Sequence, residues 1–254
     1  MFESPFEKKQ NSESKEKEIV LDLRLLETTQ EWVDKYKDLM EDEFLKKKFN
    51  REKRLHDHVE YLESFASDVV HKKNKEGLYV VDIGPGPGEL LEICRALGYK
   101  TKGYDAKIED CEMGVPYIEL SRHMAKRQKL DIEYCGFENI LDDLPLEDNS
   151  VFMISSRGSI EQVFKKHLIG VPHREHHSAR MLTWSLSKKM KEDFVSLFEQ
   201  AKRVLVPGGI FLVYGNGATN ISAYNDFILE TISQVEGLTC DGTDNQTIHR
   251  IRKI

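Results

Sequence analysis

The residues whose types and spacing could do chemistry form a short turn after an apolar run. A β-branched segment carries Asp82 near its end, Gly84, Gly86 and Gly88 follow at every second position, and residues 89–97 then have the pattern of a helix. A backbone that turns sharply and lies against a ligand has no room for Cβ atoms, which favours glycine here. The N-terminus of the following helix would direct free N–H groups at that ligand.

The glycine spacing separates two kinds of nucleotide site. A nicotinamide or flavin turn, Gly-x-Gly-x-x-Gly, needs its third glycine at position 89. That position is Glu89, and a carboxylate there would sit close to a pyrophosphate. The spacing therefore favours a ligand without phosphate. A strand-to-helix turn that binds nothing is the alternative.

A second chemical group lies in residues 155–186, which we interpret as an insertion. Between Lys165 and Lys191 the only acid is Glu175, so this segment is basic in an acidic protein. Its histidines are candidate bases near neutral pH: His167, His173, His176 and His177. No acidic partner at ligand spacing supports a metal site, so we expect none. A solvated surface loop is the alternative interpretation.

Strands alternating with helices must position these residues, and this alternation predicts an α/β fold with a parallel sheet covered by helices on both faces. The expected strands are 79–83, 100–105, 130–134, 150–155, 210–214, 238–240 and 247–254. The expected helices are 89–97, 116–128, 187–204 and 221–235. Pro207, Gly208 and Gly209 are expected to end a helix and turn the chain into the fifth strand.

The N-terminal part has a different character. Residues 1–18 resemble a flexible tail, and 19–77 a helical extension with apolar residues at helical spacing in 32–44 and 55–70. These helices either pack as plain structural elements or cover the site. The main domain is then expected to span 78–254.

The composition restricts the class of protein. The chain has 254 residues, 32% of them charged, with a net charge of −7 and no long apolar run. We therefore expect a cytoplasmic protein without a membrane span, for which nucleic acid is an unfavoured partner. The four cysteines form no Cys-x-x-Cys pair, which favours reduced thiols. The sequence does not indicate the oligomeric state.

Four segments between Tyr79 and Tyr214 occur in the order of a known family. They are the Asp-x-Gly-x-Gly-x-Gly turn at 82–88, the acid Asp105 after the second strand, Leu-Pro-Leu-Glu-Asp-Asn-Ser-Val-Phe at 144–152, and Arg-Val-Leu-Val-Pro-Gly-Gly at 203–209. Together they resemble the class I S-adenosylmethionine (SAM)-dependent methyltransferases, of the Rossmann-like methyltransferase superfamily. Met153 stands where many members have an acid, so no role is carried over for that acid.

This resemblance implies a mostly parallel, seven-stranded Rossmann-like sheet with helices on both faces, N-terminal helices and a C-terminal antiparallel strand. It implies SAM as cofactor. The residues that it places on SAM are Asp82, Gly84, Pro85, Gly86, Gly88, Asp105, Ala106, Glu138, Asn139 and Ser155.

The resemblance also implies an enzyme that transfers a methyl group. The acceptor expected is an oxygen of a small molecule or glycan, an anionic one included, with Arg157, Arg174 or Arg180 on its charge. Ser155 to Gly158 is not the Asn/Asp-Pro-Pro-Tyr/Phe motif of amino-methylating enzymes, and no Pro-Cys ends strand four. The alternatives are an N-methyltransferase acting on protein or RNA, and a methyltransferase-like protein that binds SAM without turnover.

Overall fold

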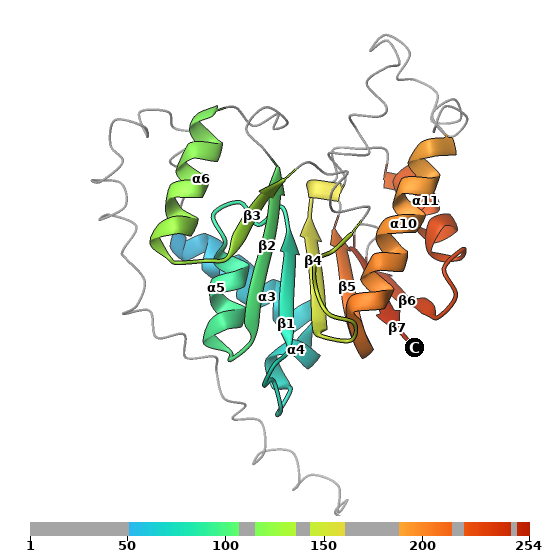
Figure 1. The fold of residues 1–254 in the computed structure, drawn as a ribbon, viewed down its shortest axis with the longest axis horizontal. Coiled ribbons are helices and arrows are strands. Elements are labelled where there is room, and N and C mark those ends of the chain that lie inside the picture. The colour runs from blue at the N-terminus through green and yellow to red at the C-terminus, as the bar shows by residue number, and fades with distance from the viewer. Residues whose placement is uncertain (1–50, 107–114, 136–142, 161–187, 215–220, 245–247) are drawn as a thin grey trace, which may run out of the picture.

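The computed structural model describes residues 51–106, 115–135, 143–160, 188–214, 221–244 and 248–254. They form one seven-stranded sheet with the strand order β3-β2-β1-β4-β5-β7-β6 (Figure 1). The strands are β1 (Tyr79–Ile83), β2 (Lys100–Ala106), β3 (Ile132–Cys135), β4 (Val151–Arg157), β5 (Leu205–Tyr214), β6 (Leu238–Asp244) and β7 (Ile248–Lys253). The first five are parallel, and β7 runs antiparallel to β5 and β6. The predicted fold class is confirmed.

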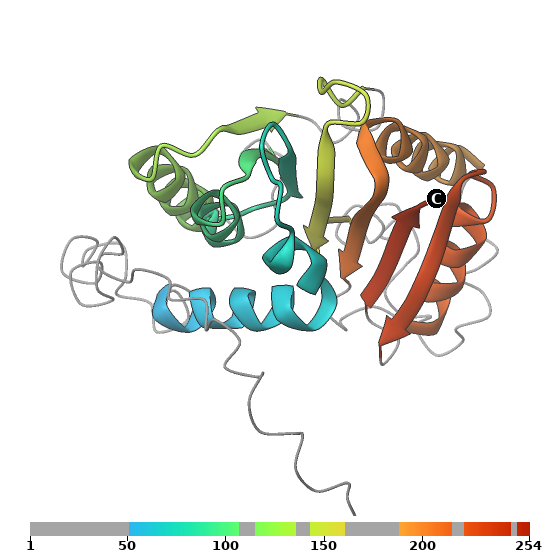
Figure 2. The ribbon, with the colours of Figure 1, turned by 90° about the horizontal axis from the view of Figure 1, so that it is seen from below.

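Helices cover both faces of this sheet. They are α3 (Arg51–Phe65), α4 (Ser67–His71), α5 (Glu89–Ala96), α6 (Val115–Arg127), α10 (Lys188–Val204) and α11 (Ile221–Ile232). Figure 2 shows α3 and α10 on opposite sides of the sheet. The helix expected over residues 32–44 lies outside the described residues. No helix in the described part of the chain is long and apolar enough to cross a membrane.

The central strands are buried on both faces, as parallel sheets between helices must be. Val80 points into one apolar cluster with residues of α3, α4 and α5, and its neighbour Val81 points into another with α10 and α11. Every residue of β4 except Arg157 is buried. This two-sided burial fixes the register of β1 and β4 and hence the position of the groups at their ends.

The segment from Pro207 to Gly209 differs from the sequence expectation. Helix α10 ends at Val204, and β5 begins at once at Leu205, so these residues lie inside the strand. The register against β4 shifts between Val151 and Met153, and Gly208 adopts φ +75°. The three residues therefore form an irregularity within β5 and not a turn before it.

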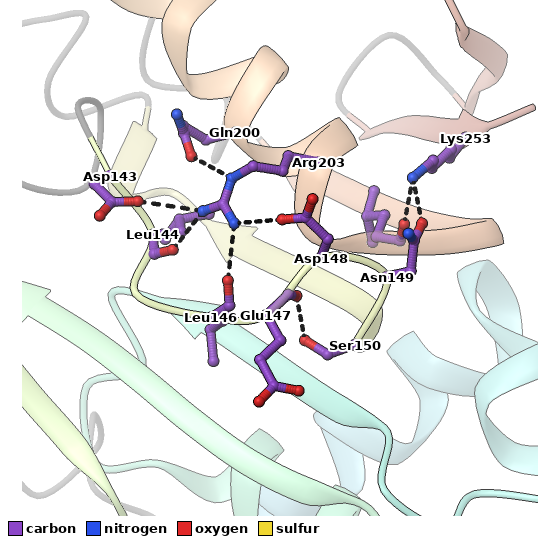
Figure 3. Close-up of polar contacts among 11 residues, drawn as sticks. Asp143, Leu144, Leu146, Glu147, Asp148, Asn149, Ser150, Gln200, Arg203 and Lys253 are labelled. Carbon is purple, nitrogen blue, oxygen red and sulfur yellow. Dashed lines mark hydrogen bonds and ion pairs between the residues drawn. The ribbon is translucent and has the colours of Figure 1, made fainter.

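Arg203 joins the segment before β4 to the end of α10, and we call this group the Arg203 clasp (Figure 3). Its guanidinium donates to the carbonyls of Leu144 at 2.6 Å and Leu146 at 2.9 Å, and to the Asp148 carboxylate at 2.8 Å. It also reaches the Asp143 carboxylate at 3.2 Å. The clasp thus joins 144–152 and 203–209, two of the segments that carry the family resemblance, at the amino edge of the sheet. We therefore assign these two segments a structural role.

Candidate functional site

The carboxyl ends of β1 and β4 lie side by side where the strand order reverses. From β1 the chain proceeds to β2 and β3 on one side, and from β4 to β5 on the other. Asp82 of β1 pairs with Ser155 of β4, and both side chains are buried. In open parallel sheets, ligands bind outside the carboxyl ends of the strands at such a reversal. Topology alone therefore makes this edge the candidate site.

The glycine turn begins directly at this edge and leads into α5. All three glycines have positive φ: +75° at Gly84, +53° at Gly86 and +89° at Gly88. A Cβ on Gly84 would collide with the side chain of Ser159, and one on Gly88 with Leu130. Internal packing thus requires two of the three glycines, a reason that the sequence interpretation did not include.

Asp82 is the most perturbed carboxyl group at the edge. Burial, followed by the negative charge of Asp105 on the neighbouring strand, raises the pKa of Asp82 to about 7. Ser155 and the charge of Arg157 oppose this increase. Because Asp105 directly follows the partner of Ile83 in the β1–β2 register, the two carboxylates share one edge. A site with two such carboxylates favours a ligand that carries positive charge and hydrogen-bond donors.

Three buried polar atoms lie at this edge without a hydrogen-bond partner among the described residues: Asp82 Oδ1, Ser155 Oγ and Tyr61 Oη. Burial raises the pKa of both Asp82 and Tyr61, and the nearby Ser155 hydroxyl only reduces this rise. Ser155 therefore lies close to both groups, although no hydrogen bond of normal geometry joins them. An unpaired buried polar atom costs about 1–3 kcal/mol. The three atoms are therefore suited to a polar ligand.

Glu89 begins α5 and is fully buried. Arg54 of α3 binds its carboxylate with two hydrogen bonds, Nε to Oε1 at 2.8 Å and Nη2 to Oε2 at 3.1 Å. Burial alone would raise the pKa of Glu89, but the charge and the hydrogen bonds of Arg54 outweigh burial, and the pKa is lowered. A carboxylate at a helix N-terminus is also favoured by the helix dipole. The pair fixes α3 beside the glycine turn.

His58 lies one turn further along α3 and faces Arg157 at the end of β4. Its Nδ1 is 3.4 Å from Nη1 of Arg157, and since a guanidinium can only donate, Nδ1 is the accepting nitrogen. Burial lowers the pKa of His58 to about 4, with the positive charges of Arg157 and Arg54 acting in the same direction and Glu89 against them. His58 is therefore neutral at physiological pH.

The structure brings together the described residues that the sequence assigned to a ligand. At the carboxyl edge lie Asp82, Gly84, Pro85, Gly86, Gly88, Asp105, Ser155 and Arg157. Ala106 is the last residue of β2. Outside the described residues lie Glu138 and Asn139, the four histidines His167, His173, His176 and His177, and the arginines Arg174 and Arg180. Among the described residues no group of His, Cys, Asp and Glu could hold a metal ion.

Three residues at this edge were not predicted from the sequence: Arg54, His58 and Tyr61. Their spacing of four and three places them on one face of α3. Such a polar face is indistinguishable, in sequence, from a solvated one. The available signal was Glu89, because a carboxylate expected at a buried helix start requires a cation nearby.

No protein-family model and no curated protein matches the chain. Among solved structures it is similar to a SAM-dependent methyltransferase from Aquifex aeolicus, with 16% identity over 78% of this chain and 88% of that chain and a TM-score of 0.42. A geranyl diphosphate C-methyltransferase from Streptomyces coelicolor gives 11% identity, 77% and 76% coverage and a TM-score of 0.43. A putative rRNA methylase from Clostridium thermocellum gives 19% identity over 78% of this chain and 96% of that chain, with a TM-score of 0.44.

These similarities are too distant to indicate a reaction or an acceptor. The strand order, the antiparallel β7 and the glycine turn at the strand reversal are features of the structure itself. On these features, the chain has the Rossmann-like fold of the class I SAM-dependent methyltransferases.

Proposed function

We propose that the protein transfers a methyl group from SAM. The observation that supports this most directly is the set of unpaired, buried polar atoms of Asp82, Ser155 and Tyr61 at the strand reversal. The left-handed Gly86 belongs to the turn that starts at the same strand end, directly after β1.

The chemistry of the edge fits SAM better than a dinucleotide. SAM carries a sulfonium and an ammonium group, and the two carboxylates Asp82 and Asp105 form an environment that positive charge would stabilise. Glu89, bound by Arg54, occupies the position at the start of α5 where a dinucleotide turn requires its third glycine. The two carboxylates therefore support the same choice that the glycine spacing indicates.

Each residue at the edge has a definite role in this proposal. SAM, when bound, supplies a methyl group already activated by a sulfonium. Asp105 accepts hydrogen bonds from ribose hydroxyls, and Asp82 and Ser155 hold the amino-acid end. Pro85 and the glycines shape the turn, and Ala106, Glu138 and Asn139 are assigned to the adenosine part. The chain contributes mainly alignment, for which the upper limit is about 7–11 kcal/mol.

The acceptor in this proposal is an oxygen of a small molecule or glycan. An oxygen acceptor must lose a proton, and the histidines 167, 173, 176 and 177 are the assigned candidates for the base. His58 is a poor substitute because its pKa is lowered to about 4. In this proposal the protein is cytoplasmic and its main domain spans 78–254. The competing functions, methylation of a nitrogen in protein or RNA and SAM binding without turnover, are separated by the experiment below.

Binding of S-adenosylhomocysteine (SAH), measured by calorimetry, tests the cofactor. Gly86→Arg is expected to abolish it. Gly98→Arg is the matched control, because Gly98 also has positive φ, at +96°, but follows α5 with open space around it. Equal SAH affinity in the two variants, or no SAH binding by the wild type, contradicts the assignment.

Transfer of a radiolabelled methyl group from SAM into fractionated cell extract then tests the acceptor. Label in the small-molecule or glycan fraction is expected. Label in protein or RNA favours the N-methyltransferase, and SAH binding with no label in any fraction favours a protein without turnover.

A further inference from the structure

Arg157 is the last residue of β4 and the one exposed residue of that strand. Ser155 and Ser156, which precede it, are fully buried. The strand therefore places the Arg157 cation at the surface, beside the strand reversal where Asp82 and Ser155 lie. An exposed arginine at the end of a buried strand has a backbone position fixed by the sheet.

Aromatic rings from two other elements hold the guanidinium of Arg157. Its Cζ lies 5.7 Å from the ring centroid of Tyr61 on α3 and 5.6 Å from that of Tyr214 on β5. The two rings also contact each other edge-on, with centroids 6.4 Å apart. Each such contact contributes about 0.5–1 kcal/mol at exposed sites. The side chain is thereby held in one position without a carboxylate.

The backbone strengthens this arrangement. Arg157 pairs with Tyr214 in the β4–β5 register, and the N–H of Gly158 donates to the carbonyl of Tyr214 at 2.8 Å. Tyr61 is buried in the apolar cluster of α3 and α5, and Tyr214 packs against the same cluster. The holding groups thus belong to the rigid part of the fold.

The charges of the described residues around Arg157 act on its cation without forming an ion pair. The carboxyl group of Asp82, whose pKa is raised to about 7, interacts with Arg157 from beyond ion-pair distance. His58, at 3.4 Å, is neutral, and the carboxylate of Glu89 is bound by Arg54. No described carboxylate lies within ion-pair distance of Arg157. An arginine retains a planar fork of N–H donors when it stacks, and this fork matches the geometry of carboxylates and phosphates.

We propose that Arg157 is a preorganised binding group for a carboxylate or phosphate of the methyl acceptor, so that the acceptor is an anion. This inference rests on the proposed methyl transfer and specifies its substrate class. The carboxylate of the methyl donor is the other anion that Arg157 could bind. If Arg157 binds the acceptor, its replacement weakens phosphate binding, and if it binds the donor, its replacement weakens SAH binding.

Calorimetric titration of inorganic phosphate into the SAH-saturated protein tests the inference. Arg157→Met is expected to weaken phosphate binding at least tenfold, and Arg157→Lys, which keeps the charge but not the fork, by about two- to fivefold. Arg95→Met is the control, since Arg95 is an exposed arginine of α5 that donates to the backbone carbonyls of Gln128 and Lys129. It should leave phosphate binding unchanged.

A second arm distinguishes the two sources of the anion. SAH and 5′-methylthioadenosine, which lacks the amino-acid part, are titrated into the same proteins. If Arg157→Met weakens SAH tenfold but not methylthioadenosine, and phosphate competes with SAH, the anion is the carboxylate of the donor and the inference is overturned. If both affinities are unchanged and only phosphate binding is lost, the anion belongs to the acceptor.

The remaining outcomes separate this inference from the proposed function. No binding of SAH by any variant contradicts the function, but phosphate titration of the free protein still tests Arg157. If Arg157→Met does not fold, Tyr214→Leu keeps the charge, removes one ring, and should weaken phosphate binding by about two- to fivefold. Phosphate binding that is absent from the wild type, or equal in the wild type and Arg157→Met, overturns the inference.

Discussion

Replacing Asp82 by asparagine should stabilise the protein and disable its site, by amounts that depend on pH. The pKa of Asp82 is about 7 in the folded protein against 3.8 for the free side chain. Between these values the unfolded chain releases a proton that the folded protein keeps, so stability falls as pH rises from about 4 to about 7. Because each pKa unit corresponds to about 1.36 kcal/mol, the loss is roughly 4 kcal/mol above pH 7.

The amide introduced by Asp82→Asn is neutral at every pH and avoids this loss. The free energy of unfolding of Asp82→Asn should therefore exceed that of the wild type by roughly 4 kcal/mol at about pH 8, and by only about 1 kcal/mol at about pH 4.5. Urea denaturation at both pH values, followed by circular dichroism, measures the difference. SAH binding should be lost in the same variant, because a carboxylate oxygen at the strand reversal is replaced.

Asp226→Asn is the control, since Asp226 is exposed on α11, on the opposite face of the sheet from α3. It should change stability by less than about 0.5 kcal/mol at either pH. The reasoning is refuted if Asp82→Asn is no more stable than the wild type at the higher pH, or if its advantage is the same at both pH values. Equal m-values are needed for the comparison, because a change in slope would indicate an altered unfolded state.

Three further substitutions test the surrounding structure by urea denaturation. Arg54→Met leaves the buried Glu89 carboxylate unpaired and should lower the free energy of unfolding by about 3 kcal/mol. Adding Glu89→Gln to the same chain should restore most of this loss, and additive effects of the two substitutions would contradict a direct pair. Gly88→Ala should lower the free energy of unfolding by at least about 1 kcal/mol, because alanine is strained in the left-handed backbone conformation, and further because its Cβ collides with Leu130. Leu130→Ala should remove the second part of this loss. An equal loss in the wild type and in Leu130→Ala would exclude the collision. Arg203→Met should cost about 1–2 kcal/mol through its lost hydrogen bonds, and a neutral effect would mean that water replaces the clasp.

The parts of the fold that depend on local pattern could be predicted from the sequence. The β-branched run before Gly84 and the amphipathic run 187–204 became β1 and α10 at nearly the expected bounds. The run 207–209 did not become a turn, because pairing with β4 extends β5 back to Leu205. A register shift between two strands is a tertiary property with no local signature.

The candidate site could be predicted where a single strand end defines it, as for Asp82 and Asp105. The contributions of α3 could not. Arg54, His58 and Tyr61 acquire their roles only because α3 packs against α5 and the end of β4, contacts between segments far apart in the chain. The functions of the histidines in 161–187 and of Glu138 and Asn139 stay predictions.

The backbone beside the Arg203 clasp provides an internal reference for measurements in solution. The amides of Asn149 and Ser150 donate to the carbonyls of Arg203 and Val204, which ties the start of β4 to the end of α10. Exchange of these hydrogens with solvent should require global unfolding, whereas amides near Gly86 can exchange through local opening. In a hydrogen-exchange experiment, a ligand that slows exchange at the glycine turn should change the exchange rates of these two amides only through the total stability of the protein. The ratio of the two rates would then report occupancy of the site independently of any change in the fold as a whole.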